Sequence, residues 1–176
     1  DPILQKDTAP DDNDFRTNYF FFDLSKPPFN NLKFRQALSH LLDRDALSQA
    51  IIKAPAAKPA VSFLAPGFPG SNAQALTNIQ RHDPALAKQL YAESGIKVDQ
   101  LILQVRDESN PSFNEIRKAI AQVYADQIRT VLGIPVEVQV LNQKTFMDLL
   151  NAKPTKITFG MISYGMDFLD QSNMLS

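Results

Sequence analysis

The sequence of 176 residues contains no cysteine and no tryptophan, and it has only two histidines, His40 and His82. Without cysteine, disulfide frameworks, thiolate metal sites, cysteine nucleophiles and iron–sulfur clusters are all excluded. A Ser-His-Asp triad or a histidine metal site would have to be built around one of the two histidines. The composition therefore leaves few of the usual nucleophiles and metal ligands.

An excess of charge of one sign is also missing. Lys and Arg together number 18 and Asp and Glu together number 19, which gives a formal net charge of −1. A protein dedicated to binding the phosphate backbone of nucleic acids carries a basic excess, and this chain has none. We therefore expect no direct nucleic-acid partner.

The sequence has neither a long apolar run nor a targeting signal. Its longest apolar run is shorter than the roughly 20 residues that a transmembrane helix needs. The first residues, Asp1-Pro2-Ile3, include no initiator methionine and none of the charged and apolar segments of a secretory signal. We therefore expect the chain to be processed or cut from a longer protein.

Apolar residues are abundant, at 44% of the chain, which is enough for the core of one ordinary domain and excludes a disordered tail. Their spacing predicts strands over 19–22, 101–105, 134–141 and 157–161, and helices over 30–42, from 43 onward, and over 83–95, 110–133 and 145–151. Residues 1–16 are predicted to be a flexible N-terminal segment and residues 54–80 a long packed loop. The alternation of strands with helices predicts an α/β fold with at least some parallel strand pairing.

Residues that favour helix ends support these boundaries. Asn30, Asp43 and Asp83 are each suited to cap the N-terminus of a helix. Gly95 and Gly133 are suited to the left-handed conformation that ends one. The sequence therefore predicts both the start and the end of the helix over 83–95.

Six motifs follow one another in a characteristic order: YFFF (19–22), KPPFNN (26–31), FRQALS (34–39), LDR (42–44), DPALAKQLYAESG (83–95) and GIPVEV (133–138). In this order they resemble the signature of the family 5 extracytoplasmic solute-binding proteins of ABC importers. Within that family, YGMDFLD (164–170) is similar to a segment of the oligopeptide-binding proteins that usually begins with tryptophan. The resemblance covers about residues 17–176.

The resemblance implies a fold and a domain organisation. The fold is α/β, one lobe of a type II periplasmic-binding-protein-like fold, with a mixed sheet flanked by helices. Residues 17–176 would form a single ligand-binding lobe, the second of two, with the first lobe missing from this chain. Strand 19–23 would leave one hinge, and the segment after Asp167 would return through the other.

The resemblance also implies a ligand site near the end of the last strand. Asp167 matches the aspartate that receives the α-ammonium of a bound peptide, because a carboxylate in a closing, water-poor cleft forms a charge-assisted hydrogen bond to an ammonium. Tyr164 stands where the family usually has tryptophan and would form an aromatic wall, and Phe168 is included in the predicted site. Ordinary roles remain open: a turn or cap for Asp167, and packing for Tyr164.

Some family positions differ here, and they leave the ligand class open. Met161 belongs to the predicted site but stands where some peptide binders carry an arginine for the ligand's carboxylate. Lys153 and Lys156 are candidate substitutes, although solvated loop charges are the ordinary interpretation. Asp23 replaces the usual asparagine and Gln171 the usual proline.

Other motif residues are expected to support the fold. Arg35, Asp43 and Arg44 lie on predicted helices near the edge of the core, where buried ion pairs or caps are expected. His40 is expected to pack in an apolar helix, and His82 to be exposed.

The sequence thus predicts a binding module that captures peptides by hinge closure and delivers them to an ABC importer in the periplasm or at the extracytoplasmic membrane surface. Its partners would be the peptide, the permease subunits and the first lobe of the same protein, with no cofactor and no metal. Two alternatives remain: the small-molecule-sensing domain of a bacterial transcriptional regulator, or a family member that binds a nickel chelate, haem or sugar. An enzyme that uses the carboxylates of Asp167 and Asp170 is not favoured, because no nucleophile has a positioned base.

Overall fold

The structure is a computed structural model, and it describes residues 17–49, 59–64, 68, 70–76, 78–107 and 111–165. Its strands are β1 (Thr17–Phe22), β2 (Leu101–Arg106), β3 (Val136–Leu141) and β4 (Phe159–Tyr164). Its helices are α1 (Leu32–Leu41), α2 (Arg44–Leu47), α3 (Ala73–Leu76), α4 (Pro84–Ser94), α5 (Pro111–Leu132) and α6 (Gln143–Leu150). Within these ranges no helix combines the length and the apolar character needed to cross a lipid bilayer.

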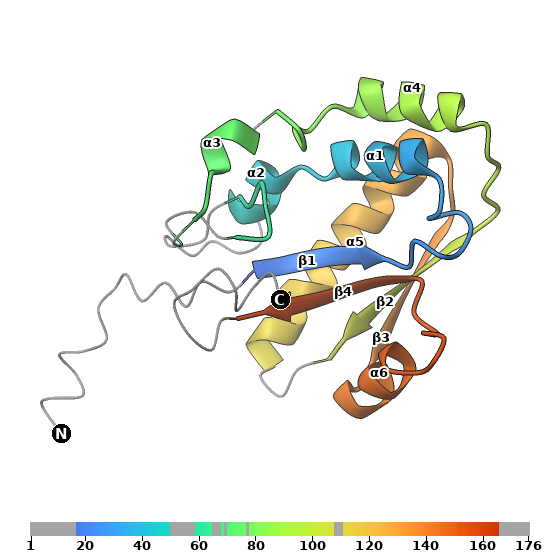
Figure 1. The fold of residues 1–176 in the computed structure, drawn as a ribbon. Helices are drawn as coiled ribbons and strands as arrows, with labels where there is room; N and C mark the ends of the chain where they lie inside the picture. Colours follow the sequence, from blue (N-terminus) through green and yellow to red (C-terminus); the bar gives the residue numbers. More distant parts are fainter. Residues whose placement is uncertain are drawn as a thin grey trace, which may run out of the picture.

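The four strands form one mixed sheet in the order β1-β4-β2-β3 (Figure 1). Strand β2 runs parallel to both β3 and β4, whereas β1 runs antiparallel to β4. The predicted α/β fold with parallel pairing is therefore confirmed. The first and last strands of the described chain lie side by side, with Thr17 opposite Tyr164.

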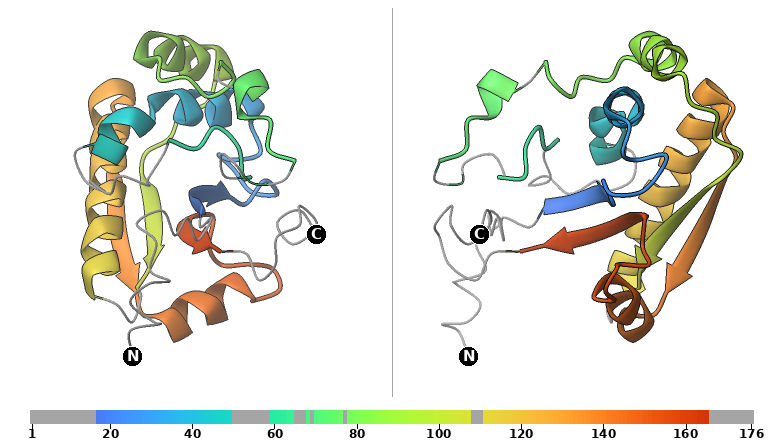
Figure 2. Two further views of the ribbon diagram at one scale, coloured as in Figure 1. Left: turned by 90° about the vertical axis from the view of Figure 1, so that its left-hand side faces the viewer. Right: turned by 45° about the vertical axis from the view of Figure 1, so that its right-hand side comes forward.

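Helices lie on either side of this sheet (Figure 2). Helix α5 packs against β2 and β3, and α1 and α4 pack against each other and against α5. On the other face, Phe146 of α6 meets the ring of Phe21 of β1 edge to face, with ring centroids 6.4 Å apart. Both faces of the sheet are thus covered by apolar side chains, as parallel sheets require.

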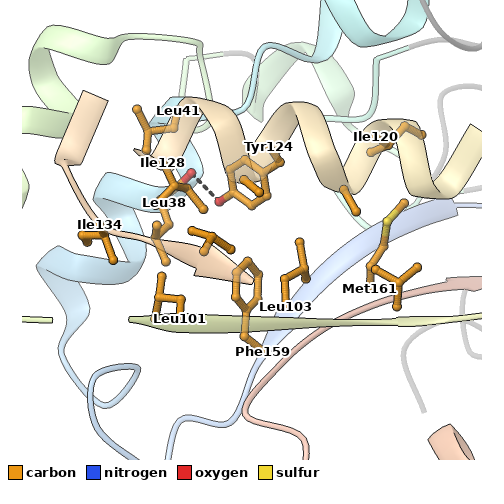
Figure 3. Packing of buried hydrophobic residues seen from close by; sticks show 14 of the residues in the cluster. Leu38, Leu41, Leu101, Leu103, Ile120, Tyr124, Ile128, Ile134, Phe159 and Met161 are labelled. Atoms are coloured by element: carbon orange, nitrogen blue, oxygen red, sulfur yellow. Dashed lines mark hydrogen bonds between the residues drawn. The ribbon is translucent and has the colours of Figure 1, made fainter. Parts of the chain in front are cut away.

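The core lies between the sheet and α5 (Figure 3). Every second residue of β2 is buried, as expected for a strand with one face on the core. Residues of α5 at helical spacing pack against these side chains. The buried residues of the two elements are Leu101, Leu103 and Val105 of β2, and Ile120, Ala121, Tyr124, Ala125 and Ile128 of α5.

Tyr124 places a polar group in the middle of this core. Its hydroxyl donates a hydrogen bond to the backbone carbonyl of Leu38 in α1 at 2.7 Å (Figure 3). Burial raises the pKa of the Tyr124 phenol far above its usual value, so the hydroxyl stays neutral and remains a donor. The bond fixes α5 against α1.

Substituting Tyr124→Phe should lower the free energy of unfolding by about 1–1.5 kcal/mol, because a buried hydrogen bond is lost while the ring is kept. Urea denaturation of the variant and the wild type measures the difference. Tyr91→Phe is the matched control: Tyr91 also lies on a helix and packs on Phe34, with ring centroids 5.7 Å apart, but its hydroxyl has no hydrogen bond to any of the described residues. Equal losses in the two variants would contradict the role given to the Leu38 bond.

Helix ends agree with most of the predicted caps. Asp43 and Asp83 cap α2 and α4, accepting from the backbone N–H of residues 46 and 86. Gly95 and Gly133 have φ values of +67° and +72°, in the left-handed region. One cap was wrong: Asn31, not Asn30, caps α1, because Asn30 belongs to the preceding turn and its N–H donates to the carbonyl of residue 26.

Further boundaries differ from the prediction: β3 begins at Val136 rather than at 134, and β4 spans Phe159–Tyr164 rather than 157–161. Helix α6 begins at Gln143 rather than at Thr145, because Asn142 caps it by accepting from the N–H of Thr145 at 2.8 Å. The predicted loop 54–80 contains the short helix α3, and parts of that loop lie outside the described residues. The predicted flexible segment 1–16 also lies outside them.

Buried ion pairs or caps were expected for the motif residues, but among the described residues the two motif arginines are not seen in ion pairs. Arg35 donates to the carbonyl of Phe29 at 2.6 Å. Arg44 donates to both the carbonyl and the side-chain oxygen of Gln80, each at 2.7 Å. Within the described ranges, these guanidinium groups bind backbone carbonyls and an amide, and so fix loops to helices without a buried carboxylate.

The two histidines also secure the segment that precedes α4. His40 is buried, and its Nδ1 lies 2.8 Å from the carbonyl of Arg81. His82 is exposed, as expected, and its Nδ1 lies 3.2 Å from the carboxylate of Asp43. Packing, rather than ligation, is therefore the observed role of His40.

Candidate functional site

The carboxyl ends of β2, β3 and β4 lie at one edge of the sheet, because these three strands are parallel. Strand β1, which is antiparallel, begins at the same edge. In open α/β sheets, ligands bind outside the carboxyl ends of the strands. We call this region the carboxyl edge, and it comprises Thr17, Tyr19, Phe63, Arg106, Ser163 and Tyr164.

Three aromatic rings form one side of the carboxyl edge. The rings of Tyr19 and Phe63 meet edge to face, with centroids 4.9 Å apart at 79°. Phe63 also stacks on Tyr164, with centroids 6.3 Å apart at 23°. The hydroxyl of Thr17 donates to the carbonyl of Phe63 at 3.0 Å and so ties loop 59–64 to the sheet. All three rings are partly exposed, which leaves aromatic surface for a ligand.

The last residue of β2, Arg106, brings positive charge to this aromatic group. Burial raises the pKa of the Tyr19 phenol above its usual value, the charge of Arg106 opposes that rise, and Tyr164 adds to it. The phenol therefore stays protonated at neutral pH and can donate a hydrogen bond. The carboxyl edge thus combines aromatic faces with a hydroxyl donor and a guanidinium.

A second arginine lies beneath the edge, on the side of the sheet that faces α5. Arg117 is only 4% exposed. It donates to the hydroxyl of Ser163 and, at 3.4 Å, to the backbone carbonyl of Arg106. Next to Arg106, the Oδ1 atom of Asp107 is enclosed and has no hydrogen-bond partner among the described residues. Charges of both signs therefore lie at or below the carboxyl edge.

This arrangement can bind a ligand by stacking, by hydrogen bonds and by charge. In the part of the chain that is described, no three side chains of the metal-ligating types gather closely enough to hold a metal ion.

The four sequence-predicted site residues have different places. Tyr164 lies at the carboxyl edge, at the end of β4. Met161 is 1% exposed and lies in the core, opposite Val105 of β2. Asp167 and Phe168 lie outside the described residues, so their roles, like those of Tyr164 and Met161, stay predictions.

The candidate substitute charges lie elsewhere. Lys153 and Lys156 are exposed in the connection that leads into β4, at the opposite edge of the sheet. Asp23 follows β1 at that same edge, and hydrogen bonds from Ser25 hold the pKa of its carboxyl below the usual value. The structure does not bring these three residues to the carboxyl edge.

Tyr19, Phe63 and Arg106 were not predicted from the sequence as candidate site residues. Tyr19 stood within an aromatic run and Phe63 within a proline-rich loop, and neither pattern points to a site. The strand pairing supplies the missing signal, because Thr17 lies opposite Tyr164 and so places Tyr19 on the same face of the sheet.

Comparison with known proteins adds to this geometry. The family model described as "Bacterial extracellular solute-binding proteins, family 5 Middle" matches residues 2–176. The chain is 29% identical over 162 residues to Heme-binding protein A of Haemophilus influenzae, covering 90% of this chain and 28% of that protein. It is 25% identical over 139 residues to the probable deoxycholate-binding periplasmic protein YgiS of Escherichia coli, covering 77% of this chain and 25% of that protein.

A solved structure is similar over most of the chain. The dipeptide-binding protein of Pseudoalteromonas sp. SM9913, in complex with Met-Leu, superposes with a TM-score of 0.77 and 26% identity, covering 90% of this chain and 30% of that one. The sheet and helices described above therefore have the type II periplasmic-binding-protein fold. The chain spans 25–30% of the length of these three proteins.

Proposed function

The chain belongs to the family 5 bacterial extracellular solute-binding proteins, and from that premise we propose that it forms one lobe of a protein that captures peptides. The observation that carries the proposal is the carboxyl edge, where the partly exposed rings of Tyr164 and Phe63 stand beside charged groups. Solute binding is the activity of the family, and the lobe would perform no covalent chemistry. The protein would act outside the cytoplasm and deliver its ligand to an ABC importer.

Peptide recognition needs groups that hold the features common to all peptides. Asp167 comes three residues after Tyr164 in the sequence, and we assign its carboxylate to the α-ammonium of the ligand. The ring of Tyr164 would pack on the ligand backbone or its first side chain, with Phe168 as a further contact. Met161, buried beneath this surface, would support it through the core.

Hinge closure would complete the site. A second lobe, supplied by the rest of the protein, would cover the carboxyl edge and exclude water. Because charge interactions strengthen as water leaves, the ammonium of the ligand and the carboxylate of Asp167 would attract each other most strongly in the closed state. Binding and closure would then be coupled.

A second candidate is an apolar ligand that carries carboxylates. The relatives named above include a haem-binding protein and a probable deoxycholate-binding protein. The observation that favours this alternative is Arg106, whose guanidinium lies close enough to the Tyr19 ring to affect its pKa. An aromatic wall beside a guanidinium suits a rigid apolar acid as well as a peptide.

Calorimetric titration of the full-length protein distinguishes these functions. A pool of peptides of two to nine residues, haem and deoxycholate are titrated separately. We expect the peptide pool to bind, and Asp167→Ala to weaken binding of its tightest component by about 10–100-fold, because a hydrogen bond to a charged group contributes about 1.5–3 kcal/mol. N-terminal acetylation of that peptide should cause a similar loss.

Asp99→Ala is the matched control, since Asp99 is exposed in the loop before β2, at the far edge of the sheet. Its affinity for the peptide should equal that of the wild type. Wild-type protein that binds haem or deoxycholate but no peptide would refute the peptide assignment. Peptide binding that acetylation does not weaken would refute the role of Asp167 alone.

A further inference from the structure

Arg117 is a guanidinium group in an apolar place. Among the described residues it is the one Lys, Arg, Asp or Glu side chain that is buried, at 4% exposure. It lies on the same stripe of α5 as Ile120, Tyr124 and Ile128, which pack against the sheet. A buried charge costs several kcal/mol unless polar groups surround it, and an apolar residue would suit this stripe. The position therefore calls for an explanation beyond stability.

The hydrogen bonds of Arg117 join two strand ends. One nitrogen donates to the hydroxyl of Ser163, the residue before the last of β4. The other donates at 3.4 Å to the backbone carbonyl of Arg106, the last residue of β2. The paired residues of β2 and β4 are Gln104 with Gly160 and Val105 with Met161. Both acceptors thus lie beyond the last paired residues of β2 and β4. At that point Arg117, rather than backbone pairing, connects the two strands.

We propose that Arg117 is a positioning residue of the ligand site, which fixes the carboxyl end of β4 to that of β2. By holding Ser163 it sets the place of Tyr164 and the point at which the chain leaves the sheet toward Asp167. Asp167 follows Ser163 by four residues in the sequence, so the end of β4 is the point from which the chain leads to the carboxylate assigned to the ligand. The inference rests on the proposed function for its effect on binding.

An arginine suits this role because its planar fork reaches two acceptors at once. A lysine at the same position has a single point charge and would hold only one of the two strand ends firmly. Lysine should therefore rescue part of the function, and methionine, which keeps the volume and removes the donors, should rescue none.

The test compares Arg117→Met, Arg117→Lys and Ser163→Ala in the full-length protein. Arg129→Met is the matched control, because Arg129 lies on the same helix and donates to the carbonyl of Val136 at 3.1 Å, at the amino end of β3. The probe is the peptide from the pool that the wild type binds most tightly, with a free and with an acetylated N-terminus. The readout is the ratio of the two affinities, measured beside stability in urea.

We expect Arg117→Met to weaken binding of the free peptide about tenfold and to bring the affinity ratio close to one. Arg117→Lys and Ser163→Ala should lie between this variant and the wild type. Arg129→Met should change neither the affinity nor the ratio by more than about twofold, whatever its stability. A change in ratio separates positioning from a general loss of stability, which lowers both affinities alike.

A wild-type affinity and ratio in folded Arg117→Met would overturn the inference. If that variant does not fold, Ser163→Ala decides, and a wild-type ratio there overturns it. If the wild type binds no peptide, the proposed function fails, and amide hydrogen exchange tests positioning alone. Residues 162–165 should then exchange faster in Ser163→Ala and in Arg117→Lys than in Arg129→Met, and equal rates would overturn the inference.

Discussion

Phe159→Ala should lower the free energy of unfolding by about 3–5 kcal/mol, because it removes a large buried ring and leaves a cavity. Phe159 is fully buried at the start of β4. Its ring meets those of Phe22 and Phe29, with centroids 5.3 and 5.6 Å apart. It also meets those of Phe20 and Tyr124, each with centroids 6.1 Å apart. The ring thus joins β1, the turn after it, and α5.

Chemical denaturation followed by circular dichroism measures this loss. A domain of ordinary stability has about 5–15 kcal/mol to lose, so the variant should unfold at a much lower urea concentration. Phe113→Ala is the control: its ring is 54% exposed on α5, and its removal should cost less than about 1 kcal/mol. A loss for Phe159→Ala as small as that for Phe113→Ala would show that these aromatic contacts do not hold the core together.

Gly160→Val should also destabilise the protein, by about 3 kcal/mol, because there is no room for a side chain at this position. A Cβ atom placed on Gly160 would lie 2.5 Å from Cε1 of Phe21 and 3.0 Å from Cγ2 of Ile157. Phe21 lies directly opposite Gly160 in the strand pairing, and its ring crosses the face of β4 there. The glycine is required by this close approach, whereas Gly95 and Gly133 are required by their backbone conformation.

A double-mutant cycle tests the cause. In a Phe21→Ala background the ring is absent, and Gly160→Val should then cost less than half of what it costs in the wild type. Thermal or urea unfolding of the four proteins gives the coupling between the two sites. The same cost in both backgrounds would show that the Phe21 ring is not what excludes a side chain at residue 160.

The elements with strong local signals could be predicted from the sequence. The alternation of Leu101, Leu103 and Val105 is confirmed as β2, because a strand with one buried face must repeat every second residue. The cap at Asp83 and the left-handed Gly95 are confirmed for α4. These features depend on neighbours within a few residues, so a single sequence contains the information.

Features that depend on distant residues could not be predicted. Asn30 and Asn31 are chemically identical, and only the turn that uses the N–H of Asn30 decides which of them caps α1. Arg44 binds Gln80, which no local pattern links to it. Charge alone suggested an ion pair for Arg44, whereas the folded loop supplies carbonyl and amide oxygens.

The candidate site, too, was predicted only in part from the sequence. Tyr164 was identified through a family motif, and the structure places it at the carboxyl edge. Its neighbours Tyr19 and Phe63 come from β1 and from loop 59–64, and only the antiparallel pairing of β1 with β4 brings them together. Motif matching finds single positions, whereas strand pairing decides which of them share a surface.

The order of the strands has a consequence for the synthesis of the protein. Strand β4 lies between β1 and β2 in the sheet although it is the last of the four in the chain. During synthesis, β1 with its run of aromatic residues leaves the ribosome well before β4, the strand with which it pairs. Until β4 emerges, that strand has an unpaired edge and exposed rings, which is the kind of surface that chaperones bind and that aggregates form through. Contacts between strands that lie so far apart in the sequence also form slowly, because a long loop must close first. We therefore expect the pairing of β1 with β4 to be the late step of folding, and the nascent chain to depend most on chaperones just before residue 159 leaves the ribosome.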